Sequence, residues 1–321
     1  MSDIELIRAA AGRLRGHVHR TPLIRSPFLD ELAGRAVWVK AECLQHTGSF
    51  KARGAWAALS ALGSAAGVLA YSSGNHAQGV ARAAAHHGVP SVVVMPADAP
   101  VLKIENTRAL GAEVVLYDRT GDQPREEIGG YLAEERGLTL VKPYDDPQVI
   151  AGQGTCGLEI AEQAQAAGVT EADVLVCCGG GGLSSGIALA LAADAPGLRV
   201  RPCEPQRYDD MARSLAAGHR LANAQAAGSI CDAILTKMPG ELTFPILSRL
   251  AGPGLVVSDD DCLMAMAQAF LRLKLVLEPG GAAALAAALR HRDQIDGDAV
   301  IVVATGGNVD PAVFARALQL L

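Results

Sequence analysis

The sequence predicts an α/β fold of two domains, with parallel-rich sheets covered by helices. Short apolar runs typical of strands alternate with segments of helical periodicity along most of the 321 residues. Such repeated alternation specifies a parallel sheet with helices on its faces. Half of the residues are hydrophobic, so the chain can bury a large core.

The first half of the chain shows the alternation clearly. Apolar residues at helical spacing predict an opening helix, Thr21-Pro22-Leu23 breaks it, and a strand pattern follows. A second helical pattern covers Ala55 to Leu62. The other elements predicted here are helix Ile4 to Leu14, strand Ala36 to Lys40, strand Val68 to Ser72, helix Ala77 to His87, strand Ser91 to Met95, helix Val101 to Leu110 and strand Glu113 to Tyr117.

The second half resumes the alternation after Tyr144-Asp145-Asp146-Pro147. Because residues 67–144 read as a self-contained α/β unit, we expect a small domain there and a large domain formed by residues 1–66 and 145–321. The functional site is expected between them, outside the carboxyl ends of the strands. The predicted elements are helix Gly157 to Ala167, strand Val174 to Cys178, helix Leu183 to Ala193, strand Arg199 to Glu204, helix Cys262 to Leu273, helix Ala282 to Arg290, strand Ala299 to Ala304 and a closing helix to Leu320.

Composition argues against several classes of function. The net charge is −6 with both signs interspersed, so no basic stripe is available for nucleic acid. The N-terminus lacks a signal-peptide pattern and no apolar run can span a bilayer, which predicts a cytoplasmic protein without membrane contact. The seven cysteines lie in apolar segments and are expected to be reduced core thiols. No Cys-x-x-Cys or His-Glu-x-x-His pattern supports a zinc site.

Lys51 is the first candidate for chemistry. It lies among small residues in His46-Thr47-Gly48-Ser49-Phe50-Lys51-Ala52-Arg53-Gly54-Ala55, just ahead of a helical pattern. A helix start and desolvation both disfavour an ammonium group. A neutral amine of this kind is the nucleophile used for Schiff bases. Taken alone, the stretch is also compatible with a solvated lysine that begins a surface helix.

Four consecutive glycines, Gly179 to Gly182, stand between an apolar strand and a predicted helix. Backbone N–H groups there can converge on a phosphate, since glycine permits close approach and the helix dipole favours an anion. The third glycine of the dinucleotide fingerprint is missing, but Glu204 stands where the ribose-binding acid is expected, so a nicotinamide cofactor stays an alternative. A turn that only packs helix against sheet is another. The absence of a Gly-Lys dipeptide excludes a Walker-type loop.

A second polar loop, Ser72-Ser73-Gly74-Asn75-His76, follows a predicted strand. Its hydroxyls and the N–H groups of the next helix suit a carboxylate, and Asn75 can donate to a phenolic oxygen. By itself the loop also reads as an ordinary N-cap, with His76 as a structural histidine.

Together these motifs resemble the fold-type II pyridoxal phosphate enzymes, which are tryptophan synthase β-like, and among them the threonine/serine dehydratase and serine racemase family. The likeness covers nearly the whole chain. It implies a large cofactor-binding domain and a small domain that closes over the substrate. The motifs that match in order and approximate spacing are Ser49 to Ala55, Ser73 to Ala81, Ala151 to Thr155, Gly179 to Leu183 and Thr305-Gly306-Gly307-Asn308.

The resemblance implies a role for each motif. Lys51 forms the Schiff base with pyridoxal 5'-phosphate and acts as the base at Cα, and Phe50 is a neighbour of the ring. Asn75 binds the phenolic oxygen. Thr305 faces the pyridine nitrogen, and because a neutral hydroxyl does not hold that nitrogen protonated, prompt loss of a β-leaving group is favoured. The residues that hold the phosphate are Gly179, Gly180, Gly181, Gly182 and Leu183.

The resemblance also implies where the substrate binds. Thr236 and Lys237 begin a loop that differs from the serine racemase loop at that place, so Lys237 is a candidate for the distal carboxylate of 3-hydroxyaspartate, while an apolar pocket would suit phenylserine. Arg125 also reads as a solvated arginine at a helix start. The residues matched to the substrate carboxylate are Ser72, Ser73, Gly74, Asn75, His76 and Arg125.

A divalent cation is expected from a further match. The family's cation site corresponds to Glu204, the Tyr208 carbonyl and Asp210 in this chain. Oxygen ligands suit magnesium, calcium or manganese. The alternative is a strand end followed by a helix capped by Asp209.

The implied activity is dehydration and deamination of a small β-hydroxy amino acid, such as threonine or serine, to a 2-oxo acid and ammonia. We expect a homodimer with a catabolic role, and no isoleucine feedback because no regulatory domain follows the Thr305 loop. The Ser73 hydroxyl, on the face of Cα opposite Lys51, predicts slow racemisation beside elimination. Alternatives are a serine racemase, a 3-hydroxyaspartate or phenylserine dehydratase, and a non-catalytic binder of pyridoxal phosphate.

Overall fold

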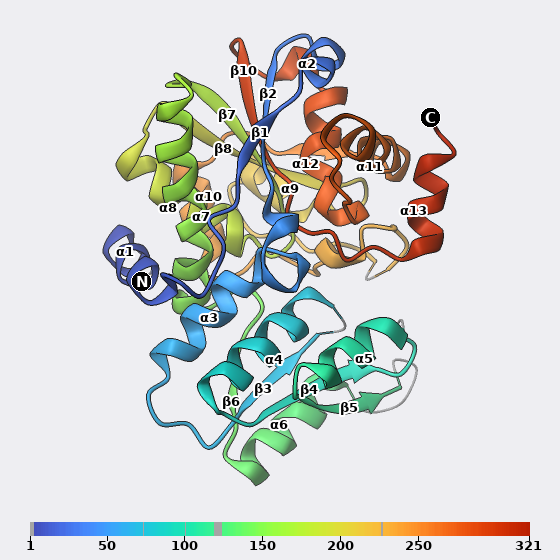
Figure 1. Ribbon diagram of the computed structural model, residues 1–321. Coiled ribbons are helices and arrows are strands. Elements are labelled where there is room, and N and C mark those ends of the chain that lie inside the picture. Colours follow the sequence, from blue (N-terminus) through green and yellow to red (C-terminus); the bar gives the residue numbers. More distant parts are fainter. Residues whose placement is uncertain (1–2, 73, 100, 119–123, 226) are drawn as a thin grey trace.

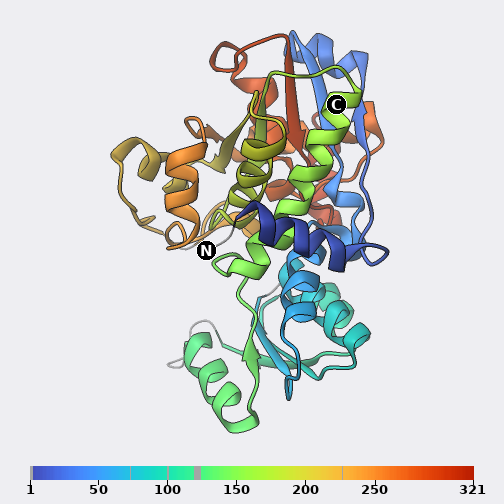
Figure 2. The same ribbon diagram turned by 90° about the vertical axis from the view of Figure 1, so that its left-hand side faces the viewer.

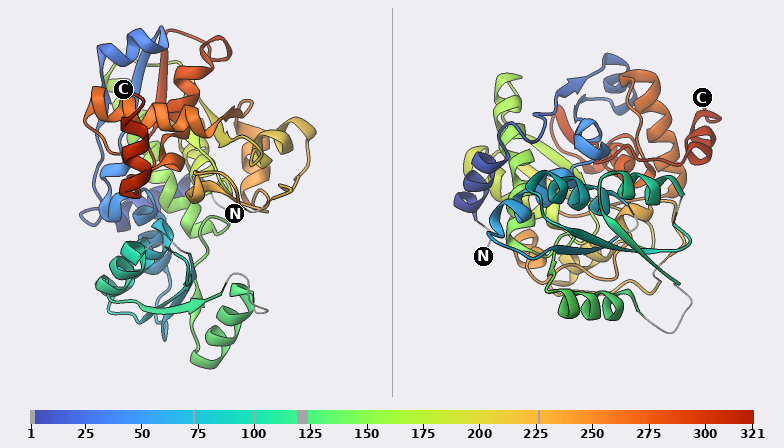
Figure 3. Two further views of the ribbon diagram at one scale, coloured as in Figure 1. Left: turned by 90° about the vertical axis from the view of Figure 1, so that its right-hand side faces the viewer. Right: turned by 60° about the horizontal axis from the view of Figure 1, so that its bottom comes forward.

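The computed structural model describes residues 3–72, 74–99, 101–118, 124–225 and 227–321. Two lobes lie one above the other, each built on its own sheet (Figure 1), and the views from either side show the same separation (Figures 2 and 3). The predicted α/β class with parallel-rich sheets covered by helices is confirmed. Within the described ranges, no helix combines the length and apolarity needed to cross a bilayer.

The larger lobe contains a six-stranded sheet in the order β1-β2-β10-β7-β8-β9. Among the strand pairs of this sheet in the described residues, β1 and β2 are antiparallel and the other pairs are parallel. At its centre β10 pairs with both neighbours, so that Val302 lies opposite Val39 and Leu175. All six residues of β7 are buried, as expected for a parallel strand covered on both faces. The strands are β1 (Leu23–Arg25), β2 (Ala36–Lys40), β7 (Ala172–Cys177), β8 (Leu198–Pro205), β9 (Leu255–Val257) and β10 (Ala299–Val303).

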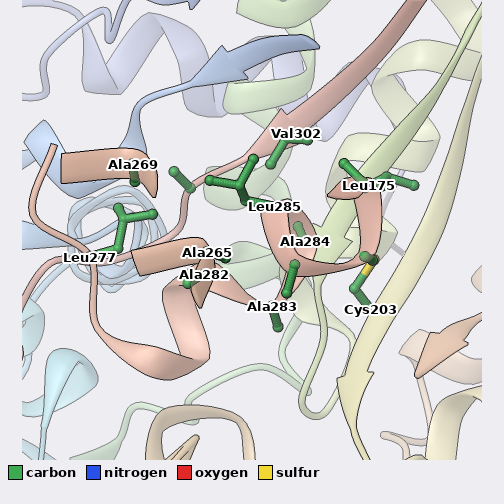
Figure 4. Packing of buried hydrophobic residues seen from close by; sticks show 14 of the residues in the cluster. Leu175, Cys203, Ala265, Ala269, Leu277, Ala282, Ala283, Ala284, Leu285 and Val302 are labelled. Atoms are coloured by element: carbon green, nitrogen blue, oxygen red, sulfur yellow. The ribbon is translucent and has the colours of Figure 1, made fainter. Parts of the chain in front are cut away.

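Helices cover both faces of this sheet. On one face α12 packs against the central strands and α11 packs on α12, while α7 and α8 cover the other face. Figure 4 shows that alanines of α11 and α12 fill the space beside Leu175 and Val302. The helices of this lobe are α1 (Ile4–Leu14), α2 (Pro27–Ala33), α3 (Lys51–Ala61), α7 (Pro147–Ala166), α8 (Gly182–Asp194), α9 (Asp210–Ala217), α10 (Thr243–Leu250), α11 (Asp259–Leu273), α12 (Pro279–Arg290) and α13 (Pro311–Leu318).

The smaller lobe contains a parallel four-stranded sheet in the order β5-β4-β3-β6. One face packs on α4 and α5, and the other on α6. Its strands are β3 (Val68–Tyr71), β4 (Ser91–Pro96), β5 (Glu113–Tyr117) and β6 (Thr139–Leu140), and its helices are α4 (Asn75–His87), α5 (Val101–Ala109) and α6 (Arg125–Arg136).

Helix α7 is ten residues longer at its start than the sequence predicts, because its glycines do not end it. A Cβ on Gly152 would lie 2.6 Å from the Arg53 carbonyl oxygen, and one on Gly157 would lie 2.9 Å from the Ile187 Cα. The glycines therefore allow α7 to approach α3 and α8 closely, and this close packing stabilises the long helix. Helix α4 likewise begins at Asn75, two residues before the predicted Ala77.

The expected core location of the cysteines is confirmed. All seven cysteines are free and buried. The Sγ atoms of Cys231 and Cys262 lie 3.6 Å apart.

Candidate active site

A cavity of about 470 Å³ lies where loops of both lobes meet. Strands β3, β7 and β10 end at this place, so the loops after Tyr71, Cys177 and Val303 line one shared space. Carboxyl ends of parallel strands meet at one edge of a sheet, which explains why the loops after β7 and β10 lie together. The loop after β3 comes from the other sheet and lines the same cavity. Of the residues predicted from sequence, the cavity brings together Phe50, Lys51, Ser72, Gly74, Asn75, His76, Gly179, Gly180, Gly181, Gly182, Leu183, Thr236, Lys237 and Thr305.

Two predicted residues cannot be placed against the cavity. Ser73 lies outside the described residues, so its predicted role stays a prediction. Arg125 begins α6, and its side chain is likewise outside the described part of the structure.

Lys51 is the first residue of α3, as its position before a helical pattern predicted. Its Nζ donates to the Pro143 carbonyl at 2.7 Å and lies 5.2 Å from the centroid of the Phe50 ring. Burial lowers the pKa of the Lys51 amine to about 8, although the nearby Glu278 carboxylate acts in the opposite direction. Lys51 is thus a buried amine whose neutral form is accessible near physiological pH.

The glycine loop forms the opposite wall. Gly181 has a left-handed φ of 91° and caps α8, a conformation that glycine adopts without strain. Elsewhere the loop is closely covered, since a Cβ on Gly180 would lie 2.2 Å from Tyr144 Cε2. In the described part of the chain, the N–H groups from Gly179 to Leu183 have no protein acceptor. Packing therefore explains the absence of side chains, and the free N–H groups leave an anion site at the start of α8.

Glu278 is a cavity residue that sequence reasoning missed. It stands just before α12, is 3% exposed, and accepts a hydrogen bond of 2.5 Å from the Asn75 side-chain amide. Burial raises the pKa of its carboxyl to about 7, against the opposing effect of Lys103. An acid before Pro-Gly-Gly reads locally as a helix cap, so no sequence signal separated it from other caps.

Asn75 is held from two sides. Its Nδ2 donates to Glu278, and its Oδ1 accepts from Asn308 Nδ2 at 2.7 Å. An amide nitrogen carries two protons, so one remains for a ligand in the cavity. The Thr305 side chain, 3% exposed, lies in the same cavity.

His76 is a neutral histidine whose side chain hydrogen-bonds to the protein backbone. Its Nε2 lies 2.8 Å from the Val141 carbonyl oxygen. Burial, followed by the charge of Lys51, lowers the pKa of His76 to about 3. Nε2 therefore carries the proton and donates it to that carbonyl, which fixes α4 against the segment that follows β6.

Two further lysines, Lys103 and Lys237, face the cavity. Lys103 comes from α5 and forms a 3.1 Å ion pair with Asp232. Lys237 is exposed and also lines a second cavity of about 440 Å³, which shares Tyr71, Pro143 and Tyr144 with the first. Lys103, Asp232 and Tyr144 were not predicted, because each is a common residue type that only the tertiary fold brings here.

The chain matches the family of pyridoxal-phosphate-dependent enzymes over residues 14–306. It belongs to that family. A similar protein is the L-threo-3-hydroxyaspartate ammonia-lyase of a Pseudomonas species, 43% identical over 99% of each chain. Among solved structures, the threonine deaminase of T.th. has 46% identity and a TM-score of 0.91 over 96% of this chain and 99% of its own. Maize serine racemase has 35% identity and a TM-score of 0.90 over 99% and 97%.

These relatives confirm the predicted fold-type II resemblance and the class of enzyme, a pyridoxal-phosphate-dependent ammonia-lyase or racemase. The cavity also fits the cofactor. Besides the free N–H groups of the glycine loop, the Ser184 hydroxyl at the start of α8 is buried and has no partner among the described residues. An unpaired buried hydroxyl is costly unless a ligand satisfies it, and a phosphate oxygen would accept its hydrogen bond.

The residues expected to bind a cation lie outside the cavity. Both Glu204 oxygens accept backbone N–H groups at the start of α9, from Met211 at 2.9 Å and Ala212 at 2.7 Å. Burial and then the neighbouring Asp210 raise the pKa of Glu204, and burial raises the pKa of Asp210 to about 6. Across the described ranges, no group of three or more His, Cys, Asp or Glu side chains is placed to hold a metal.

Proposed function

We propose that the enzyme is an ammonia-lyase that dehydrates and deaminates a β-hydroxy α-amino acid, with L-threo-3-hydroxyaspartate as its preferred substrate. The observation that carries the proposal is the pair Lys103 and Lys237, which line the cavity in addition to Lys51. A second carboxylate on the substrate can then pair with one of these two ammonium groups. The 43% identity with a hydroxyaspartate ammonia-lyase supports the same choice.

The proposed division of labour follows the two sheets. Residues 1–66 and 145–321 would form the large domain that holds the cofactor, and residues 67–144 the small domain that closes over the substrate. The position of Lys51 and the glycine loop on the larger lobe and of Ser72 and Asn75 on the smaller one supports this division.

The chain's own groups would hold the cofactor at several points. The N–H groups from Gly179 to Leu183 and the Ser184 hydroxyl suit its phosphate. The remaining Asn75 N–H suits the phenolic oxygen, and Thr305 the pyridine nitrogen. Phe50 contributes an apolar surface beside Lys51.

When bound, pyridoxal phosphate supplies the electron sink that makes the Cα proton of the substrate acidic. Lys51, whose pKa is about 8, can accept that proton as a neutral amine. The Ser72 hydroxyl and the N–H groups at the start of α4 would bind the α-carboxylate. The β-hydroxyl takes up a proton near the glycine loop and leaves as water. Loss of water would leave an enamine of the 2-oxo acid, and hydrolysis of its imine form by one water molecule would release ammonia. The products of 3-hydroxyaspartate would therefore be ammonia and oxaloacetate.

A second candidate is dehydration of threonine or serine, favoured by the 46% identity with threonine deaminase. The deciding experiment compares kcat/KM of the purified holoenzyme for L-threo-3-hydroxyaspartate, L-threonine, L-serine and phenylserine, since discrimination is a ratio of transition-state affinities. The proposal expects the highest value for hydroxyaspartate, with oxaloacetate formed in step with ammonia. A higher value for threonine would transfer the assignment to threonine dehydration.

We also propose that a divalent cation binds between Glu204, Asp210 and the Tyr208 carbonyl. Both carboxylates are buried, and neither forms a salt bridge within the described part of the chain. The Tyr208 carbonyl accepts no hydrogen bond from the described residues. A cation would offset the repulsion between two buried carboxylates.

A cytoplasmic homodimer remains a prediction from the sequence.

A further inference from the structure

One ion pair joins the two lobes at the wall of the cavity. Lys103 Nζ, from α5 in the smaller lobe, lies 3.1 Å from Asp232 Oδ2 in the larger lobe. Asp232 begins the short 3-10 helix Asp232–Ile234. Both side chains line the cavity, so the pair stands where a substrate must enter or bind.

The two partners differ in how firmly they are held. The Lys103 side chain is 15% exposed, whereas that of Asp232 is 59% exposed. The next residue, Ile104, is packed in the core between α4, α5 and β4, which anchors the helix that carries Lys103. Asp232 can therefore turn into water at little cost, while Lys103 would be left without an anion in a mostly buried place.

Lys103 also lies beside the loop proposed for the α-carboxylate. Its Nζ is 3.8 Å from the position that a Cβ would take on Gly74. The two carboxylate carbons of 3-hydroxyaspartate are about 4 Å apart at ordinary bond lengths. A substrate whose first carboxylate binds at the Ser72 hydroxyl and the start of α4 thus brings its second within reach of Lys103.

The charge of Lys103 acts inside the cavity. It is the strongest of the influences that lower the pKa of the buried Glu278, and Asp232 acts in the opposite direction. Lys237, by contrast, is exposed and lies between two cavities. Lys103 is therefore less exposed to water than Lys237. A carboxylate would pair more strongly with Lys103, because water weakens the attraction between charges.

We propose that Lys103 binds the distal carboxylate of a dicarboxylic β-hydroxy amino acid, and that Asp232 occupies Lys103 until this carboxylate displaces it. This inference rests on the proposed function. Asp232 then acts as an internal competitor with the same chemical group as the substrate. Displacement exchanges one lysine–carboxylate pair for another and releases an exposed aspartate to water, so the selection of a substrate with two carboxylates needs no additional cation.

The competitor role gives the two partners opposite effects. With holoenzyme, Lys103→Met should lower kcat/KM for hydroxyaspartate relative to threonine by about 10- to 100-fold, as expected for loss of a charged hydrogen bond. Asp232→Asn should raise the same ratio, mainly through a lower KM for hydroxyaspartate. An ion pair that only holds the lobes together would instead give both variants the same direction of change. Asp260→Asn, an exposed aspartate on α11, is the matched control.

A binding measurement tests the idea without turnover. L-Aspartate and L-asparagine have the same shape but differ in the charge of the distal group, and neither carries a β-hydroxyl. Their dissociation constants can be measured by titrating the visible absorbance of the holoenzyme. The ratio of the two dissociation constants gives the preference for aspartate over asparagine. This preference should fall in Lys103→Met, rise in Asp232→Asn, and change less in Lys237→Met.

The outcomes separate this inference from the proposed function. If wild-type enzyme prefers threonine to hydroxyaspartate, the proposed function fails, and with it the basis of this inference. If wild type prefers hydroxyaspartate but Lys103→Met weakens both substrates equally, Lys103 serves the α-carboxylate and the inference alone is overturned. A larger loss of aspartate preference in Lys237→Met than in Lys103→Met also overturns it.

Discussion

Asn75 and Glu278, 203 residues apart in the chain, share a hydrogen bond of 2.5 Å at the wall of the cavity. Asn75 begins α4 in the smaller lobe, and Glu278 precedes α12 in the larger one. The bond therefore ties the first turn of a helix at the cavity wall to a carboxylate whose charge acts on Lys51. Because the buried carboxyl of Glu278 accepts a hydrogen bond from the other lobe, its protonation state affects the contact between the lobes.

The first prediction concerns the pH dependence that Glu278 imposes on the apoprotein. Its pKa is raised from 4.5 to about 7, so the folded state binds more protons than the unfolded state between these values. The stabilisation is complete below pH 4.5 and is lost as pH rises through about 7. Glu278→Gln removes this titration. Its unfolding free energy should match that of wild type near pH 4 and exceed it at pH 8.5 by on the order of 3 kcal/mol, and the melting temperature should follow in the same direction. A difference that does not vary with pH would contradict the assignment.

Lys51→Ala should abolish turnover while the fold is retained. The change removes the amine proposed to anchor the cofactor and to accept the Cα proton. Ammonia release and the visible absorbance of the bound cofactor should both disappear, while circular dichroism stays that of wild type. Lys142→Ala, an exposed lysine on the second cavity, is the control and should keep the absorbance. Ammonia released at the wild-type rate by Lys51→Ala would refute the role of Lys51.

Arg53 is predicted to stabilise the helix that carries Lys51. It is fully buried and pairs with Glu42 at 2.7 Å and Glu159 at 2.7 Å. Arg53→Met leaves Glu42 buried without its nearest cation, at a cost of about 3–5 kcal/mol. Arg53→Lys should recover only part of this, because lysine lacks the planar fork. Urea unfolding of the holoenzyme measures the loss. Arg8 provides the comparison, because its ion pairs with Glu5 and Asp194 are solvent-exposed. Arg8→Met should lower the unfolding free energy by less than about 1 kcal/mol.

The sequence was most informative where the chemistry depends on consecutive residues. Lys51 at a helix start, the glycine run and the Ser72 loop each form a local pattern, and each lies in the cavity as its pattern indicated. The strand and helix alternation likewise predicted both sheets. Periodicity could not predict β1 and β9, with three residues each, or β6 with two.

The rest of the site depends on contacts between distant segments. Glu278, Lys103 and Ser184 are single residues of common types. Glu278 and Lys103 stand out through partners far along the chain, and Ser184 through a buried hydroxyl that has no partner among the described residues. The early start of α7 was missed for a related reason. Glycine weakens an isolated helix, but here it permits close contact with α3 and α8, and packing outweighs propensity.

The cation proposal predicts a response to chelation. An ion that binds only the folded state stabilises it by mass action, so EDTA should lower the melting temperature and magnesium, calcium or manganese should restore it. Asp210→Asn should remove this response. In EDTA the variant should be at least as stable as wild type, since it relieves repulsion with the buried Glu204. Identical melting curves for wild type with and without each ion would eliminate the site.

The last prediction concerns the contact between Gly180 and Tyr144. A Cβ on Gly180 would lie 2.2 Å from Tyr144 Cε2, and one on Gly182 would lie 2.9 Å from Tyr144 Cβ. Gly180→Ala must therefore displace either the tyrosine ring or the loop whose N–H groups suit the phosphate. We expect a weaker affinity of the apoprotein for pyridoxal phosphate, by about tenfold or more, because misplacing a preorganised binding loop loses several charge-assisted hydrogen bonds.

The measurement is the dissociation constant of pyridoxal phosphate, obtained by titrating apoprotein. Gly12→Ala is the matched control, since nothing lies within 4 Å of a Cβ at this exposed helical position, and it should leave affinity unchanged while adding up to about 1 kcal/mol of stability. If the clash with the ring is the cause, the double change Gly180→Ala with Tyr144→Ser should regain part of the affinity, because the smaller side chain leaves room for the new methyl group. Wild-type affinity in Gly180→Ala alone would mean that Tyr144 yields without moving the loop, and that the ring does not position the phosphate-binding N–H groups.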